Sequence, residues 1–130
     1  MYVLDTNTLI YFFKGFGNIA THLLETAPKD IGIPSIVLFE LEVGIAKSSY
    51  PQKRQMQLKN FMTVVNLLPF GLEAAGISAS IRADLEQQGN SIGPYDILIA
   101  GTAMASKGIL VTHNTKEFSR IKDLTVIDWY

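Results

Sequence analysis

Residues 2–7 read YVLDTN, a short apolar run that ends in a carboxylate, a hydroxyl and an amide. Consecutive apolar residues without polar alternation predict a strand that is buried on both faces, as in a parallel sheet. Ligands of such sheets bind at the carboxyl ends of the strands. Asp5 follows the predicted strand directly, and it is therefore the first candidate for a functional acid.

The rest of the chain alternates further short apolar runs with helical segments. Strands are predicted at Ile31–Ile33, Val64–Leu68, Ile109–Val111 and Val126–Ile127. Helices are predicted over Thr8–Phe13, on Ile19, Leu23 and Leu24, from the N-cap Ser35 to Lys47, from Pro51 past Phe61, over Leu72–Gln87 and from Pro94 to Gly108. This order predicts an α/β fold, a three-layer sandwich with a mainly parallel central sheet flanked by helices, from which the helices near Ser35 and Pro51 protrude as a helical hairpin.

Length and composition are those of one globular domain over residues 1–130. The chain is 48% hydrophobic and 18% charged, so it can bury a core, and it has no cysteine, which excludes thiolate metal sites and cysteine nucleophiles. Its formal net charge of -1 lacks the basicity expected of a sequence-specific DNA-binding protein. No apolar stretch approaches the roughly 18 residues of a membrane-spanning helix, and no basic leader precedes the first strand. We expect a cytoplasmic protein that does not bind membranes.

Positive charge is concentrated in one interval of the chain. No Asp or Glu occurs between Glu42 and Glu73, and the same interval contains four cations: Lys47, Lys53, Arg54 and Lys59. Such a stretch could contact the phosphates of a nucleic acid, but a solvated helix face is the commoner interpretation. Charge alone favours the solvated face.

Asp5, Thr6 and Asn7 together offer the oxygen ligands that Mg²⁺ and Mn²⁺ prefer, either directly or through bound water. The simpler alternative is that Asp5 is only the N-cap of the following helix, which is a common role for aspartate. The residues themselves leave both interpretations open.

Two glutamates lie on the predicted helix that follows Ser35. The helical neighbours of Glu40 are apolar, so its carboxylate would need a compensating partner such as a metal ion, an arginine or a bound proton. Glu42 has equally apolar neighbours. Helical periodicity therefore does not separate the two, and one of them could simply face solvent.

Asp96 lies two residues after Pro94, in the first turn of a predicted helix. The helix dipole is by itself a sufficient reason for an acid at that position. The residues that follow Asp96 are so apolar, however, that the helix is expected to be buried. Asp96 would then lie at the entrance to the protein interior, where the buried helix begins.

Polar residues also follow the predicted strand Ile109–Val111, again at a carboxyl end. Thr112 and Asn114 could hold metal-bound water or cap the next short helix, and Glu117 lies just beyond them. His113 could act as a general base because imidazole titrates near neutrality, but a histidine in a surface loop is the commoner case.

Four motifs, taken in order along essentially the whole chain, resemble those of the PIN-domain nucleases and, more narrowly, of the VapC-type toxins. They are Leu4-Asp5-Thr6-Asn7; Glu40-Leu41 with Gly44; Ile92-Gly93-Pro94-Tyr95-Asp96 with Ile99-Ala100; and Val111-Thr112-His113-Asn114 with Glu117-Phe118. The resemblance implies a PIN-like parallel sheet flanked by helices. It also implies that acids from separate strand and helix ends converge on one or two Mg²⁺ or Mn²⁺ ions.

Carried over position by position, the resemblance makes Asp5, Glu40 and Asp96 the catalytic, metal-binding triad, and it selects Glu40 rather than Glu42. Thr6 or Asn7 would orient ligands or water.

Many relatives have a fourth acid at the position of Asn114. The resemblance therefore implies one of three arrangements: the amide of Asn114 substitutes, Glu117 reaches into the site, or a second metal ion is weakly held. Thr112 would be a further residue that orients water.

The implied activity is metal-dependent hydrolysis of RNA phosphodiester bonds by the toxic member of a toxin–antitoxin pair. The resemblance also implies a small cognate antitoxin whose tail occupies the acidic site. In the family, the helical hairpin contributes to dimerisation and to the rim of the active groove. A homodimer is thus expected, and the cations of the hairpin become candidate RNA contacts, namely Lys47, Lys53, Arg54 and Lys59.

Two other functions compete with this one. A PIN-like scaffold without catalysis would act as a binding or regulatory module, although the presence of all three acids argues against it. A phosphatase that uses Asp5 as a phosphate-accepting nucleophile is a second alternative. Such an enzyme would require an acid where this chain has Asn7, and it would leave Glu40 without a role.

Overall fold

The computed structural model describes residues 1–130. Its strands are β1 (Tyr2–Leu4), β2 (Ile31–Pro34), β3 (Asn66–Leu68), β4 (Ile109–Val111) and β5 (Val126–Ile127). Its helices are α1 (Thr6–Lys14), α2 (Ile19–Leu24), α3 (Ser35–Ala46), α4 (Pro51–Met62), α5 (Leu72–Gln88), α6 (Pro94–Ala105) and α7 (Thr115–Phe118), with a short 3-10 turn at Pro28–Asp30. The order of strands and helices along the chain is the predicted one.

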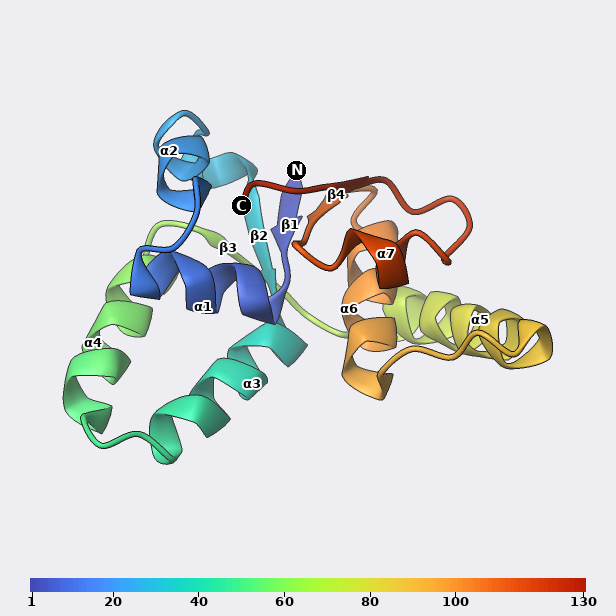
Figure 1. Ribbon diagram of the computed structural model, residues 1–130, viewed down its shortest axis with the longest axis horizontal. Coiled ribbons are helices and arrows are strands. Elements are labelled where there is room, and N and C mark those ends of the chain that lie inside the picture. The colour runs from blue at the N-terminus through green and yellow to red at the C-terminus, as the bar shows by residue number, and fades with distance from the viewer.

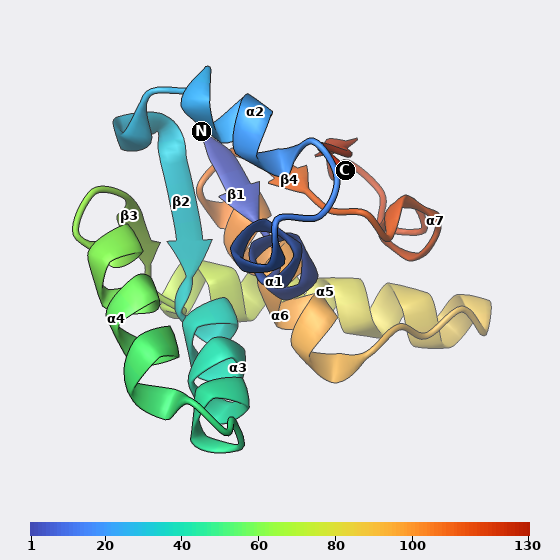
Figure 2. The same ribbon diagram turned by 60° about the vertical axis from the view of Figure 1, so that its left-hand side comes forward.

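All strands belong to one parallel sheet in the order β3-β2-β1-β4-β5. The chain first moves outward from β1 through β2 to β3, and then crosses back over β1 to β4 and β5. Because the direction reverses, helices cover both faces, with α1 on one side of β1 and α6 on the other (Figure 2). The predicted three-layer sandwich is confirmed. Asp5 leaves β1 at the point where the strand order switches, which is where ligands of such sheets bind.

Helices α3 and α4 form the predicted helical hairpin. They contact each other, and their joined ends extend away from the sheet (Figures 1 and 2). Pro51 begins α4, as its fixed φ favours.

Several element boundaries differ from the prediction. α1 begins at Thr6 because Asp5 itself is the N-cap residue. Ser35 is not an N-cap, since β2 runs directly into α3 and Pro34 takes the cap position without a side-chain bond. β3 starts only at Asn66, because the backbone N–H groups of Thr63 and Val64 still donate to carbonyls of the last turn of α4.

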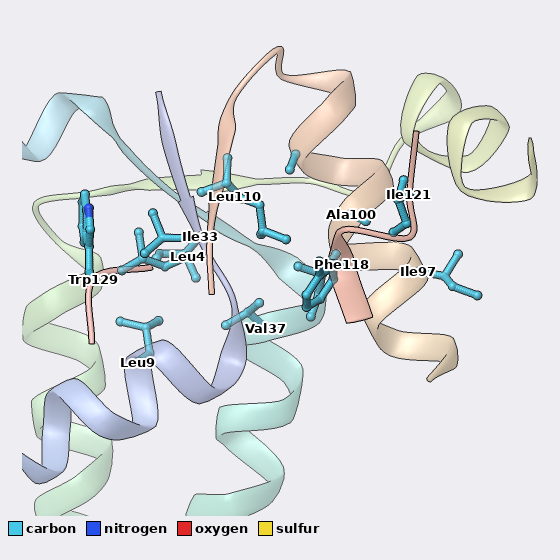
Figure 3. Close-up of a cluster of buried hydrophobic side chains, with 14 of the residues drawn as sticks. Leu4, Leu9, Ile33, Val37, Ile97, Ala100, Leu110, Phe118, Ile121 and Trp129 are labelled. Carbon is cyan, nitrogen blue, oxygen red and sulfur yellow. The ribbon is translucent and has the colours of Figure 1, made fainter. Parts of the chain in front are cut away.

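The core lies between the sheet and the helices on its two faces. Val3 and Leu4 are both 0% exposed, which confirms that β1 is buried on both faces. Figure 3 shows side chains from β1, β2 and β4 meeting others from the helices, among them Leu9, Val37 and Phe118. None of the helices has the combination of length and hydropathy that crossing a bilayer requires.

Gly101 lets α5 and α6 approach closely on the far side of the sheet. A Cβ atom at Gly101 would overlap Ser78 Oγ, and it would lie 3.0 Å from Ser78 Cβ and 3.1 Å from the Ala74 carbonyl oxygen. Gly101→Ala should therefore force the two helices apart and lower the free energy of unfolding by about 1–3 kcal/mol in a chemical denaturation experiment.

Gly76→Ala is the matched control, because Gly76 lies on α5 and a Cβ atom there would meet nothing within 4 Å. It should leave stability unchanged or raise it by about 0.5–1 kcal/mol through helix propensity. Equal shifts for the two variants would contradict the steric argument.

Candidate active site

The carboxyl ends of β1 and β4 lie side by side because the two strands are parallel neighbours. Asp5 follows one strand and Thr112 follows the other. Thr112 Oγ1 donates a hydrogen bond of 2.5 Å to Asp5 Oδ2, and the backbone N–H of Thr8 donates one of 2.9 Å to Asp5 Oδ1. Asp5 therefore is the N-cap of α1, but capping uses only one carboxylate oxygen and holds the other at the sheet edge.

Asp5 is only 4% exposed. Burial raises the pKa of this carboxyl above the ordinary aspartate value, whereas the hydrogen bonds from Thr112 and Thr8 lower it. The carboxylate of Asp128 adds to the rise. Sequence reasoning missed Asp128, although it follows β5 directly and the carboxyl-end rule that selected Asp5 would have found it.

Glu40 lies on α3, where that helix contacts α1. Thr6 Oγ1, in the first turn of α1, donates a hydrogen bond of 2.7 Å to Glu40 Oε1. Glu42 is exposed on α3 and accepts a hydrogen bond of 3.0 Å from Gln55 Nε2 on α4. The tertiary structure thus separates two glutamates that periodicity could not distinguish: Glu40 faces the sheet edge and Glu42 faces the hairpin partner.

Asp96 lies in the first turn of α6 and is half-buried. Burial is the largest cause that raises the pKa of Asp96 to about 6, and the negative charges of Asp5, Glu40 and Glu117 add to it. Acids from the end of β1, from α3 and from α7 therefore all act on Asp96 at the start of α6.

Positive charge from the chain does not balance these acids. The ion pairs in the structure are Arg82–Glu86, exposed on α5, and His113–Asp128. No lysine or arginine pairs with Asp5, Glu40, Asp96 or Glu117. The site consequently has an excess of negative charge that a cation from solution would relieve.

Asn114 and Glu117 act as a pair. Asn114 Nδ2 donates a hydrogen bond of 2.6 Å to Glu117 Oε2, and the Asn114 backbone N–H donates one of 3.0 Å to Thr112 Oγ1. Glu117 is one of the three acids whose charge raises the pKa of Asp96, and the amide of Asn114 holds Glu117 by its hydrogen bond. Asn7 is exposed on α1 and its side chain makes no hydrogen bond to the protein, so Thr6 is the member of that pair that contacts an acid.

His113 has a structural partner of its own. Its Nδ1 lies 2.9 Å from Asp128 Oδ2, and its ring stacks on Tyr130 with centroids 4.2 Å apart. The side chain is 45% exposed. These contacts agree with the loop histidine that the sequence favoured over a general base.

A cavity of about 500 Å³ opens between α1, α3 and α4, beside the acids. Glu40 lies on its wall together with Lys47, Arg54 and Lys14. Lys14 comes from α1 and was not among the cations that the charge pattern of the sequence indicated. We call this cavity the basic groove. Lys53 and Lys59 are exposed on α4 and lie outside the basic groove.

Comparison with known proteins identifies the family of this fold. The model of the PIN domain family matches residues 2–124. The chain belongs to the PIN-domain family. The fold that resembled this family is therefore that of a true member, and Asp5 lies where its sheet switches direction.

Relatives within the PIN-domain family are VapC proteins. The chain is 37% identical over 131 residues to ribonuclease VapC2 of Rickettsia felis, covering 99% of this chain and 98% of that protein. It is 34% identical over 128 residues to the tRNA(fMet)-specific endonuclease VapC of Shigella flexneri, covering 98% and 97%. The VapBC2 structure from Rickettsia felis, bound to a promoter DNA fragment, has a TM-score of 0.93 at 36% identity over 99% of this chain and 98% of that one. The VapC-type resemblance is confirmed.

Proposed function

We propose that this protein is a metal-dependent endoribonuclease that hydrolyses RNA phosphodiester bonds as the toxic component of a toxin–antitoxin pair. The observation that carries the proposal is that Asp5, Glu40 and Glu117 lie close enough to Asp96 for their charges to act on it, while no lysine or arginine pairs with any of the four. Asp5 lies where a parallel sheet binds its ligands. The names of its relatives, which are ribonucleases and an RNA endonuclease, support RNA as the substrate.

The donor set fits a hard divalent cation such as Mg²⁺ or Mn²⁺, because all of its side-chain donors are oxygens. Asp5, Glu40 and Asp96 would hold the ion. No three His, Asp or Glu side chains converge closely enough to bind a metal together as they stand, so part of the coordination would pass through water, which Mg²⁺ retains readily. Bound there, the cation would lower the pKa of a water molecule and offset charge on the phosphate.

The surrounding residues would position the acids. Thr112 fixes one oxygen of Asp5, and Thr6 fixes one oxygen of Glu40. Asn114 directs Glu117 toward the site, which would let this pair replace a fourth acid by holding metal-bound water. Oriented carboxylates need no rearrangement as charge develops, which is how a preorganised site lowers a barrier.

The basic groove would bind the RNA backbone. Its cations, Lys14, Lys47 and Arg54, lie along a cavity whose wall includes Glu40, so a phosphate chain in the groove would lead toward the acids. Lys53 and Lys59 would add long-range attraction from the outer face of α4.

Lys47→Ala and Arg54→Ala should each raise KM for RNA severalfold and leave kcat nearly unchanged. Each should also reduce the slope of log affinity against log salt by about 0.7 for every phosphate of a single strand that the wild-type cation neutralises. Lys53→Ala removes the same charge outside the groove and serves as the control, with a smaller expected effect. Equal effects at Lys47 and Lys53 would contradict binding in the groove and would favour long-range electrostatic attraction of RNA by all of these cations.

The proposal includes three further features. A cognate antitoxin is expected to bind, because solved structures of similar chains are VapBC complexes from Rickettsia felis, Salmonella typhimurium and Haemophilus influenzae. We also propose that the chain acts as a homodimer and that it works in the cytoplasm.

The decisive test is cleavage of a panel of structured RNAs that includes transfer RNAs. Purified protein, separated from any antitoxin, would be incubated with Mg²⁺, with Mn²⁺ and with EDTA. Cuts at defined positions that require the metal and disappear with chelator are the expected result. A protein that cuts none of these RNAs under any metal condition would favour the binding-module alternative.

A further inference from the structure

Two aromatic residues immediately precede two of the acids in the sequence and lie outside the hydrophobic core. Phe39 immediately precedes Glu40 on α3, and Tyr95 immediately precedes Asp96 on α6. Their ring centroids lie 5.8 Å apart with the planes at 70°, so the rings form an edge-to-face pair between helices that contact each other. The two helices lie next to each other in Figure 1.

Both rings are open to solvent. Phe39 is 50% exposed and Tyr95 is 46% exposed. Neither belongs to the hydrophobic core or to the partly buried side chains that pack against it. The exposed half of each ring gains no free energy from burial, so stability of the fold does not explain why this much aromatic surface faces solvent.

RNA bound at the acids needs favourable contacts beyond its phosphates, since the carboxylates repel them. Aromatic side chains supply such contacts to unpaired bases, because every base has a face that can stack, and each stacked base contributes about 1–3 kcal/mol. A base inside an A-form helix is already stacked and cannot reach a protein ring. A ring pair beside the acids would thus favour single-stranded loops over duplex.

We propose that Phe39 and Tyr95 form a stacking platform for one unpaired base of the RNA, next to the phosphate that is cut. This inference rests on the proposed function and names two side chains, Phe39 and Tyr95, that would hold a base of the RNA beside the cleavage point. The platform lies beside Glu40 and Asp96, and the basic groove leaves Glu40 on the hairpin side. Base and backbone would therefore be bound on two sides of the acids.

One other occupant to consider is a second copy of the chain. On α3 the large apolar side chains exposed to solvent are Phe39 and Val43, and on α6 the only one is Tyr95. Stable interfaces bury roughly 800 Å² on each partner, which exceeds the exposed surface that two half-buried rings and one valine can supply. Phe39 and Tyr95 directly adjoin Glu40 and Asp96 in the sequence, which favours an RNA base as the occupant. A dimer contact is one of the outcomes that the test distinguishes.

The test measures RNA binding in EDTA, so that it does not depend on cleavage. The probe is a hairpin RNA with a single-stranded loop, compared with versions that carry an abasic nucleotide at each loop position in turn. For at least one position, wild-type protein should bind the intact loop about 5- to 150-fold more tightly than the abasic loop. Phe39→Ala and Tyr95→Ala should bind the two RNAs with nearly equal affinity.

Conservative and control variants keep the test specific. Phe39→Tyr and Tyr95→Phe should retain the preference for the intact loop. Phe16→Ala removes a ring that is 48% exposed just after α1 and pairs with Tyr11 rather than with Phe39 or Tyr95, and it should also retain the preference. Thermal denaturation would establish that each variant is folded.

Each result has one meaning. Absence of base preference in the wild type overturns the platform, even if metal-dependent cleavage succeeds. Alanine variants that weaken both RNAs equally, or that sediment as a smaller species than the wild type, overturn it in favour of a structural or dimer contact. Ring-dependent base preference without any cleavage supports the platform while the proposed catalytic function fails.

Discussion

Asp96→Asn should lower metal-dependent RNA cleavage about 10²- to 10³-fold while making the folded protein more stable near neutral pH. Activity falls because the amide cannot supply a negative ligand or orient metal-bound water as the carboxylate would. Stability rises because Asp96 is half-buried beside Asp5, Glu40 and Glu117, and the amide removes that repulsion. A cleavage assay and thermal denaturation of the metal-free protein would measure the two effects.

The gain in stability depends on pH in a defined direction. The pKa of Asp96 is about 6 in the folded protein, above the ordinary aspartate value of 3.8 that describes the unfolded chain. Between these values the folded state holds a proton that the unfolded state has released, so the contribution of Asp96 to stability is lost as pH rises through 3.8 to 6. Allowing for solvent screening at a half-exposed group, wild type should lose about 1–2 kcal/mol relative to Asp96→Asn.

Asp84→Asn is the control for this comparison. Asp84 is exposed on α5, so the substitution changes net charge equally without relieving a buried group. It should leave cleavage and the pH dependence of stability as in the wild type. If Asp96→Asn retained cleavage, or were less stable than wild type at pH 7, the acid would have a structural role instead.

Asp5→Asn should also lower cleavage about 10²- to 10³-fold, but with little change in stability. The asparagine side-chain oxygen can still accept the hydrogen bond from the Thr8 backbone N–H, so the cap of α1 survives. Asp5→Ala removes both the cap and the acceptor for Thr112 Oγ1, and it should lower the free energy of unfolding by about 1–3 kcal/mol as well. Cleavage assays and chemical denaturation of both variants would separate charge from capping.

The Asp5 variants also discriminate the alternative functions. A cleavage-competent Asp5→Asn protein would show that Asp5 is only a helix cap. A phosphatase that used Asp5 as its nucleophile would carry a phosphoryl group on this residue, detectable as a mass increase of its peptide that Asp5→Asn lacks. A binding module would keep its affinity for a partner in both the wild type and Asp5→Asn.

Much of the fold is determined by local patterns in the sequence. Short runs such as Tyr2–Leu4 and Ile109–Val111 are too uniformly apolar for a sheet with a solvated face. The pattern of these runs between helical segments therefore predicts a parallel sheet covered by helices. Element boundaries are less accurately predicted. Whether Ser35 or Pro34 caps α3 depends on how directly β2 enters that helix, which is a property of the backbone path.

The sequence by itself placed Asp5 and Asp96 at element ends, because position after a strand or in a first helical turn is a local property. It could not separate Glu40 from Glu42 by helical periodicity. It also could not show that Asn114 holds Glu117 toward Asp96 or that Lys14 joins the groove. Those facts require the packing of α3 against α1 and the approach of Glu117 to Asp96, since the charge and burial of a side chain depend on residues distant in sequence. The sequence determined which elements form, and the tertiary structure decided which of their acids meet.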